Sequence, residues 1–404
     1  MPTLGCTEPA SIALAAAVAA GGLRGAIRRI DLTVDPKMYK NCYAVGIPHS
    51  GRRTGILWAA AIGAHLPDSP RSLLLFSHTT KDVLTKALEL ISKGKIRVQV
   101  DTTKENLFID CLVHGDKDWG HCIIEDEHTN IVLVERNGTA MEKRSASHKT
   151  RRSIRQAVVG MELDEMLEMS RSISSDDRDK LRYGTGLNRR ISEHGLSLFP
   201  EDFVKLTVDD EATRASALVC GGVYARMWGE ELPVMSLAGS GNKGIVASVP
   251  LIVRGEMAGC EKEHVDEAQA LACLVTSATT RHLGTLSAVC GCSNAAGIGL
   301  AAGLVMLEGG GKKEIELAIH NMVGNVTGMI CDGAKIGCAL KTMTSVDAAL
   351  RASSLAMNGV GIPPSDGIVG ATGGASLTNL GRIATRGMIS TDAEILSIMQ
   401  EKMS

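Results

Sequence analysis

The sequence predicts an α+β protein, with an N-terminal α/β part that holds a mostly antiparallel sheet and a C-terminal all-α helical domain. Up to about Val134, short runs rich in β-branched residues alternate between apolar and polar side chains, which is typical of strands. From about Val208 to the end, Gly- and Ala-rich helical segments follow one another with no convincing strand. With 404 residues, 44% of them hydrophobic, the chain can bury two cores of ordinary size.

The first expected element is an Ala-rich helix from Pro9 to Ala20, with Thr7 as its N-cap and Pro9 in its first turn. Two more helices are expected at Ile56–Ala64 and Lys81–Lys93. Strands are expected at Ile30–Val34, Ile96–Val100, Phe108–Val113, His121–Ile124 and Asn130–Val134. The last three are separated by polar turns, which indicates an antiparallel meander.

Four segments are expected along the chain. They are an N-terminal helix (1–24), an α+β sheet domain (25–136), a linker with connecting helices (137–207) and the helical domain (208–404). Residues 137–157 are polar and basic, but no aromatic residue stands between the charges. We therefore interpret them as a solvated linker and not as a nucleic-acid patch.

Charge and composition exclude several classes of function. The net charge of −2 offers no general attraction to nucleic acid or to an anionic membrane. The start shows no basic leader before an apolar core, and no apolar stretch is both long and uncharged enough to span a bilayer. We expect a cytoplasmic protein that acts on a small molecule, with no nucleic-acid or membrane partner; a homo-oligomer is left open.

The chain has eleven cysteines, which in a reducing cytosol are buried hydrophobes, metal ligands or catalytic thiols. Cys331 and Cys338 would stand about 10.5 Å apart along a continuous helix, too far for one compact cluster. The breakers Asp332-Gly333 and Gly337 would let the segment fold back. Two buried cysteines in a Gly-rich helix pair remain the alternative, since this is not the spacing of common zinc or ferredoxin sites.

Cys290 and Cys292 are separated by one glycine. Adjacent ligands of this kind can bind one metal, but one of the two thiols can equally be a packing residue. Three thiolates around a four-iron cluster would leave one iron open for substrate, by the logic that separates catalytic from structural zinc.

Cys6 stands just before the first expected helix, in Gly5-Cys-Thr-Glu-Pro9. Free N–H groups and the positive end of the helix dipole lower the pKa of a thiol at that place. Cys6 is therefore expected to be a thiolate that acts as base or nucleophile. The alternative is an N-terminal cysteine without a role.

The Gly-rich loop Ala238–Gly244 can bring backbone N–H donors close to an anion such as a substrate carboxylate. It matches neither the Walker A loop nor the dinucleotide fingerprint, so it is a carboxylate loop or a turn. His128-Thr-Asn130 lies between two expected strands and can add polar contacts, although a loop histidine is more often only solvated.

Together these motifs resemble the L-cysteine desulfidase family, which is related to the iron–sulfur serine dehydratases. The resemblance rests on Gly5–Pro9, Lys40-Asn41, Ile47-Pro48, His128–Asn130, Gly239–Gly244, Leu286–Cys290 and Met329–Ala334 through Cys338. It implies a [4Fe-4S] cluster in the helical domain on Cys290, Cys331 and Cys338, without Cys292, and Cys6 as proton acceptor. The substrate-binding residues that it implies are Asn41, His128, Thr129, Asn130, Ser240, Gly241 and Asn242.

The implied reaction is β-elimination of L-cysteine to sulfide and an aminoacrylate, which hydrolyses to pyruvate and ammonia, with the open iron as Lewis acid and no pyridoxal phosphate. One alternative is L-serine or a related substrate. The other is a member without catalysis that binds a metabolite or senses the cluster. Tyr224 replaces an expected aspartate, Leu198–Phe203 departs from the usual Tyr-Gly-Leu pattern, and the chain starts five residues before Cys6, where relatives carry a further helix.

Overall fold

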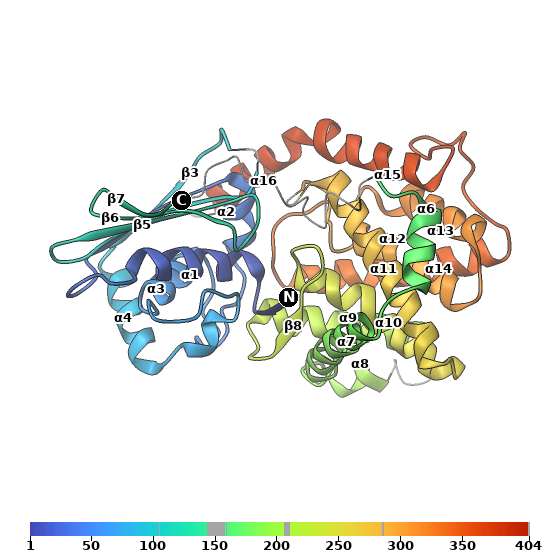
Figure 1. Cartoon of the computed structure of the whole chain (residues 1–404), viewed down its shortest axis with the longest axis horizontal. Helices are drawn as coiled ribbons and strands as arrows, with labels where there is room; N and C mark the ends of the chain where they lie inside the picture. Colours follow the sequence, from blue (N-terminus) through green and yellow to red (C-terminus); the bar gives the residue numbers. More distant parts are fainter. Residues whose placement is uncertain (105, 144–157, 159, 206–210, 285–286, 403–404) are drawn as a thin grey trace.

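The computed structural model of the protein shows two lobes side by side (Figure 1). It describes residues 1–404 except 105, 144–157, 159, 206–210, 285–286 and 403–404. Most of the basic stretch expected as a linker, and Leu286 of one motif, therefore lie outside the described residues. The expected α+β class, with a sheet in the N-terminal part and helices in the C-terminal part, is confirmed.

The first lobe is built on a sheet with the strand order β3-β2-β4-β5-β6-β7. Its strands are β2 (Arg29–Val34), β3 (Ile96–Val100), β4 (Phe108–His114), β5 (Trp119–Glu125), β6 (Ile131–Arg136) and β7 (Thr139–Lys143). β2 and β3 pair in parallel across a helical connection, and the other pairs are antiparallel. The expected meander is present, and β7 extends it into residues that were expected to be linker.

The helix α1 (Thr7–Ala20) lies between this sheet and α3 (Ile56–Ala64), and all of its residues are buried. Its small side chains allow close backbone contact on both sides. A Cβ at Gly63 of α3 would lie 2.2 Å from the Ala13 carbonyl oxygen, and one at Gly120 of β5 would lie 2.0 Å from the Ala19 carbonyl oxygen. Alanine and glycine at these positions thus bring helix and sheet together.

The start of α1 differs from the expectation. Thr7 is not the N-cap but the first helical residue, and Cys6 takes the N-cap position in extended conformation. Gly5 has φ 71°, which turns the chain one residue earlier. The Thr7 hydroxyl donates to the Glu8 side chain at 2.9 Å.

The remaining helices of the sheet lobe are α2 (Pro36–Cys42), the 3₁₀ helix η1 (Leu75–His78) and α4 (Lys81–Ser92). Asp35 caps α2 by accepting from the backbone N–H groups of Lys37 and Met38. Its second carboxylate oxygen accepts from the Phe108 backbone N–H at the start of β4. A single buried side chain thus fixes α2 against the sheet.

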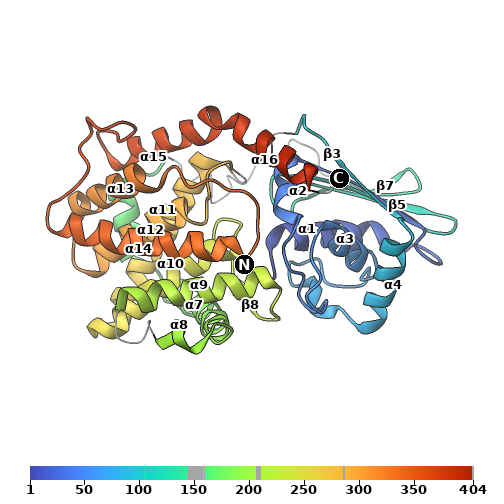
Figure 2. The same ribbon diagram turned by 180° about the vertical axis from the view of Figure 1, so that it is seen from behind.

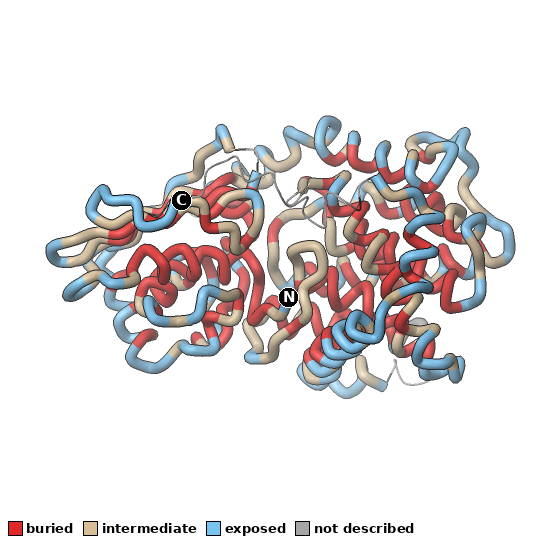
Figure 3. The backbone as a smooth tube through the Cα atoms, viewed as in Figure 1, coloured by how far each residue is buried: buried red, intermediate tan, exposed pale blue. Residues whose placement is uncertain are grey.

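The second lobe is helical. It comprises α6 (Leu163–Arg171), α7 (Ser175–Leu196), α8 (Glu201–Lys205), α9 (Glu211–Trp228), α10 (Gly241–Ala258), α11 (Lys262–Leu283), α12 (Asn294–Leu307), α13 (Lys312–Val326), α14 (Gly337–Met357) and α15 (Gly373–Arg382). Every residue of α12 is buried, and α10, α11, α13 and α14 pack around it. Figure 3 shows the buried residues concentrated inside this lobe and in the helices that lie on the sheet.

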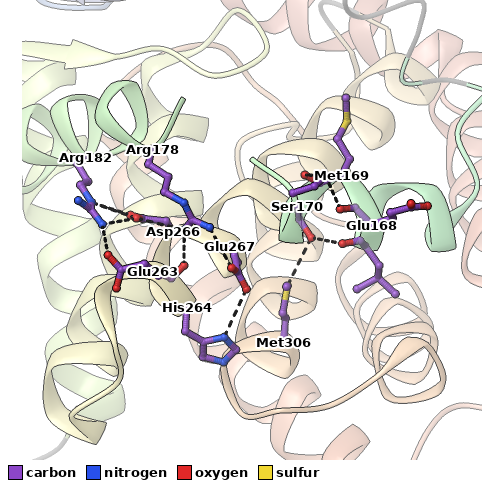
Figure 4. A network of polar contacts seen from close by, with 12 residues as sticks. Glu168, Met169, Ser170, Arg178, Arg182, Glu263, His264, Asp266, Glu267 and Met306 are labelled. Atoms are coloured by element: carbon purple, nitrogen blue, oxygen red, sulfur yellow. Dashed lines mark hydrogen bonds and ion pairs between the residues drawn. The ribbon is translucent and has the colours of Figure 1, made fainter. Parts of the chain in front are cut away.

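Ion pairs between helices support this lobe at its surface (Figure 4). Arg182 of α7 pairs with Asp266 of α11 at 2.7 Å, and Arg178 pairs with Glu267 at 3.1 Å. The Asp266 side chain is only 5% exposed, so this network is less screened than an ordinary surface pair.

One expectation for the second lobe is wrong in detail, because the C-terminal half does contain a strand. β8 (Pro233–Met235) pairs antiparallel with β1 (Pro2–Leu4) at the start of the chain. Three residues are too few for an alternating pattern to be visible in the sequence. This small sheet ties the N-terminus to the helical lobe.

The chain also returns to the first lobe at its other end (Figure 2). A short π-helical stretch, η2 (Ile383–Gly387), links α15 to α16 (Ile389–Glu401), which packs against α2. Among the described residues, no helix combines the length and apolar character that a membrane crossing requires.

The contact between α1 and α3 generates a prediction. Gly63→Ala should lower the free energy of unfolding by about 1–3 kcal/mol, because its Cβ overpacks against Ala13. Gly186→Ala, at an exposed position of α7, is the matched control: its Cβ meets nothing within 4 Å, so the change should raise the free energy of unfolding by about 0.5–1 kcal/mol. Urea unfolding followed by circular dichroism measures both, and equal effects would contradict the close contact.

Candidate active site

A small cavity of about 70 Å³ lies where the two lobes meet. Its walls come from the start of α1 and from α2 in the sheet lobe, and from α9, α10 and the segments before α12 and at the start of α14 in the helical lobe. The residues singled out in the sequence that line it are Cys6, Asn41, Ser240, Asn242, Cys290, Cys331 and Cys338. The fold thus brings motifs from both halves of the chain to one place.

A short backbone pairing brings Cys290 and Cys331 together. Val289 and Ile330 form an isolated antiparallel bridge. The Cys290 N–H donates to the Met329 carbonyl at 2.9 Å, and the Cys331 N–H donates to the Ala288 carbonyl at 2.7 Å. Because side chains alternate along paired strands, the residues on either side of the bridge pair point to one face, so the two thiols share a face.

Cys338 reaches the same cavity because the chain folds back after Cys331, as the breakers in this segment predict. Residues 331–336 are not helical, and α14 begins at Gly337. Gly333 has φ 103°, and a Cβ there would lie 2.4 Å from the Lys40 carbonyl oxygen. Glycine therefore lets this loop turn while it lies against α2.

Burial and neighbouring groups raise the pKa of all three thiols. Burial raises the pKa of Cys338 to about 12, and the charges of Cys290 and Cys331 add to it. Burial also raises the pKa of Cys331, against an opposing effect of Lys40. A hydrogen bond with Cys292, followed by burial, raises that of Cys290. Three such thiols become thiolates together only where a cationic group offsets their charge.

Three thiols around one cavity are a donor set of the kind that can hold an iron–sulfur cluster. Within the part of the chain that the structure describes, no three His, Cys, Asp or Glu side chains lie close enough to hold one metal ion. The ligands of one zinc ion all lie about 2.0–2.3 Å from it. Cluster thiolates bind different irons and therefore stand farther apart. Cys290, Cys331 and Cys338 line the same cavity and could each bind a different iron of one cluster.

Cys6 lies beside Glu8 at the edge of α1. Its Sγ donates to Glu8 Oε2 at 2.8 Å, and burial followed by the charge of Glu8 raises the pKa of the thiol well above its usual range. The expectation of a thiolate is therefore wrong, because burial and the carboxylate outweigh the helix dipole. Burial also acts to raise the pKa of Glu8, but His128, Cys6 and Arg226 together lower it to about 2.

Four residues expected to bind substrate do not line the cavity: Gly241, which precedes Asn242 in α10, and the three residues of the His128–Asn130 motif. His128 is buried behind Glu8, with its Nε2 3.9 Å from Glu8 Oε1, which is too long for a hydrogen bond. The Asn130 side chain donates to the Glu125 carbonyl at 2.9 Å and closes the turn between β5 and β6. Thr129 is half-buried in the same turn. The structure therefore places the three residues of this motif outside the cavity lining.

The Gly-rich loop forms a tight turn that leads into α10. Leu237 and Ser240 exchange two backbone hydrogen bonds of 3.0 Å, and Gly239 has φ 82°. Ser240 is the N-cap of α10 but makes no side-chain cap hydrogen bond. Since Ser240, Asn242 and Lys243 line the cavity, the N-terminus of α10 forms part of its wall.

Lys40 fastens the Cys331 loop to the C-terminal helix. Its side chain is 1% exposed, and its Nζ donates to the Cys331 carbonyl at 2.7 Å and pairs with Asp392 of α16 at 2.5 Å. A buried ammonium group needs such partners, because it has lost its water. The position of one cysteine thus depends on α2 and α16 together.

Two of the three departures from the family pattern, Tyr224 and Leu198–Phe203, lie next to each other and outside the cavity lining. The rings of Tyr224 and Phe199 are 4.9 Å apart, and those of Phe199 and Phe203 are 5.0 Å apart. Trp228 stacks on Tyr224 at 5.9 Å. None of these four residues lines the cavity. These two departures therefore belong to one aromatic cluster outside the cavity lining.

Some residues of the cavity went unassigned in the sequence. Glu8 and Lys243 belong to motifs singled out in the sequence, but neither residue was assigned a role there. Arg226 is the single charged residue between Ala215 and Trp228, and a lone charge in an apolar helix is the signal that marks it. Cys292 also lines the cavity, with its Sγ 3.4 Å from the Ser240 hydroxyl.

A cavity lined by cysteines thus lies between an α+β lobe and a helical lobe. Residues 99–397 match the family described as serine dehydratase alpha chain. The protein therefore belongs to the serine dehydratase alpha chain family. This membership indicates a dehydratase-like lyase activity.

The chain is also similar along its length to three bacterial UPF0597 proteins. It is 36% identical to that of Caldanaerobacter subterraneus subsp. tengcongensis, over 99% of this chain and 96% of the relative. The Clostridium tetani protein is 36% identical over 100% of this chain and 96% of the relative. The Desulfotalea psychrophila protein is 36% identical over 99% of this chain and 95% of the relative. The names of these relatives state no reaction.

Proposed function

We propose that the protein is a cytoplasmic β-elimination lyase that converts L-cysteine to pyruvate, ammonia and sulfide through an aminoacrylate. The convergence of Cys290, Cys331 and Cys338 on one buried cavity carries the proposal, in a chain of the serine dehydratase alpha chain family. A [4Fe-4S] cluster on these thiolates would supply the Lewis acid that polarises the substrate. The proposal needs no pyridoxal phosphate.

The pair of Cys6 and Glu8 accepts the α-proton. The neutral thiol and the carboxylate together carry one negative charge and can take up one proton. Cys6 Sγ receives the α-proton while its own proton passes along the 2.8 Å hydrogen bond to Glu8 Oε2. Cys6 remains the proton acceptor that the resemblance implies, but Glu8 holds the charge that makes it possible. The electrons of the broken Cα–H bond form the Cα=Cβ double bond as the β-thiolate leaves.

The remaining polar residues hold the substrate. Asn41, Ser240 and Asn242 line the cavity, and there they contact the substrate directly. His128 stands behind Glu8 and acts through that carboxylate as a positioning residue. Cys292, which is outside the ligand set, lies against Ser240 at the same wall.

The choice of L-cysteine over L-serine rests on the resemblance and on leaving-group chemistry. A thiol has a pKa near 8.5 in a free side chain, so a thiolate leaves without prior protonation. A hydroxyl group needs a proton donor to leave as water. The second candidate, dehydration of L-serine, is favoured by the name of the matching family.

Turnover under anaerobic conditions separates the two candidates. L-cysteine should yield sulfide, pyruvate and ammonia in equal amounts without added pyridoxal phosphate, and L-serine should react more slowly. Sulfide and pyruvate are measured in the same sample. Faster release of pyruvate from L-serine would favour the dehydratase reaction over cysteine desulfidation. If neither amino acid yielded product, both candidate functions would be contradicted.

Substitutions at Cys6 and Glu8 test the proton transfer. Cys6→Ser and Glu8→Gln should each lower kcat by about 10²–10⁴-fold, because the hydroxyl is a poor base and the amide cannot take the proton. Thr7→Val is the matched control, since it removes the other donor to Glu8 Oε2, at 2.9 Å, and keeps the pair. Exchange of the α-proton with solvent deuterium should fall in parallel with kcat. Undiminished exchange in Glu8→Gln would exclude the pair as acceptor.

A further inference from the structure

Arg226 is a buried cation without a counterion. It is 1% exposed in α9 and lines the cavity between the lobes. Within the described part of the chain it forms no ion pair with an acidic side chain. A buried charge without such a partner is costly, and proteins keep one where a ligand completes it.

Its free hydrogen-bond donors lie on one edge of the guanidinium group. Nη1 donates to Asn242 Oδ1 at 2.9 Å. Nε and Nη2 have no hydrogen-bond partner among the described residues. The N–H bonds of Nε and Nη2 point in the same direction from the planar group, which is the fork that binds both oxygens of a carboxylate.

The start of α10 packs closely against this guanidinium group and adds positive charge beside it. A Cβ at Gly241 would lie 2.5 Å from Arg226 Nε and 2.8 Å from Cζ, so glycine allows the backbone of α10 to pack against the guanidinium group. Asn242 holds its other end. The N-terminus of α10 also forms the cavity wall and adds the positive end of a long helix.

The opposite charge in the cavity belongs to Glu8. The charge of Arg226 contributes to the low pKa of Glu8, yet the two side chains form no ion pair within 4.0 Å. Arg226 therefore adds to the effect of His128 and Cys6 on Glu8 from a distance and retains its own fork for another anion. A ligand whose carboxylate binds Arg226 would direct the rest of its atoms toward the Cys6–Glu8 pair.

We propose that Arg226, oriented by Asn242 and backed by Gly241 at the start of α10, binds the α-carboxylate of the substrate through Nε and Nη2. This deepens the proposed function and rests on it: the substrate class is α-amino carboxylic acids, and amides or amines of the same shape are excluded. Gly241 does not line the cavity. It takes part in substrate binding indirectly, because the absence of a side chain leaves space for the Arg226 guanidinium group.

Binding of an unreactive pair of probes tests this separately from turnover. L-alanine has the carboxylate but no β-leaving group, and L-alaninamide differs from it only in that carboxylate. Isothermal titration of the anaerobically purified protein should show L-alanine bound roughly tenfold or more tightly than L-alaninamide, as expected for hydrogen bonds between charged groups. Arg226→Met should remove the preference, and Arg226→Lys, which keeps the charge and loses the fork, should reduce it.

Arg182→Met is the matched control. It removes an arginine of α7 that is paired with Asp266 and does not line the cavity. The preference for L-alanine over L-alaninamide should therefore be unchanged. The thermal midpoint without ligand separates a binding role from a packing role: Arg226→Met should match or exceed the wild type, because an unpaired buried charge is removed. If Arg226→Met fails to fold, Arg226→Lys carries the test.

An unchanged preference for L-alanine in folded Arg226→Met or Arg226→Lys would overturn the inference, as would equal binding of both probes by the wild type. Neither result depends on catalysis. A protein that shows the preference but turns over neither L-cysteine nor L-serine would retain the carboxylate site and contradict the proposed function alone.

Discussion

The close backbone contact between the two lobes is the constraint on which the cavity depends. Gly46 of the sheet lobe donates its N–H to the Met227 carbonyl at 2.8 Å, and a Cβ there would lie 2.4 Å from the Trp228 carbonyl. Gly333 meets the backbone of Lys40 in the same way. Residues without side chains let the segments that carry the cysteines and the start of α1 approach one another. A larger side chain at either glycine would separate the thiols from Cys6.

The second organising feature is the distribution of buried charge. Lys40 is neutralised within the protein by Asp392, and it holds the Cys331 loop in place. Glu8 and Arg226 are not neutralised by each other, although both line the cavity. Among the described residues, Lys40 thus has a carboxylate partner that supports the fold, whereas Arg226 has none. The three thiols are a further set that only a cationic group completes.

Much of the fold and of the site could be predicted from local pattern. The strands alternate with period two, the breakers around Gly333 allowed the return of Cys338, and the cysteines stood out by type. Three features could not be predicted, because they depend on contacts distant in sequence. The pairing of β1 with β8 has too few residues for a pattern. The high pKa of Cys6 follows from burial beside Glu8, and the role of Arg226 follows from its missing partners.

The central claim is that Cys290, Cys331 and Cys338 hold one [4Fe-4S] cluster. The most direct measurement is iron and acid-labile sulfide content, with an ultraviolet–visible spectrum, of anaerobically purified protein and its cysteine variants. Alanine at each of the three positions should abolish or deplete the cluster. Cys220→Ala, a buried cysteine of α9 outside the cavity, should retain it. Wild-type protein without iron after anaerobic reconstitution, or the same iron content and spectrum in all three variants, would contradict the account.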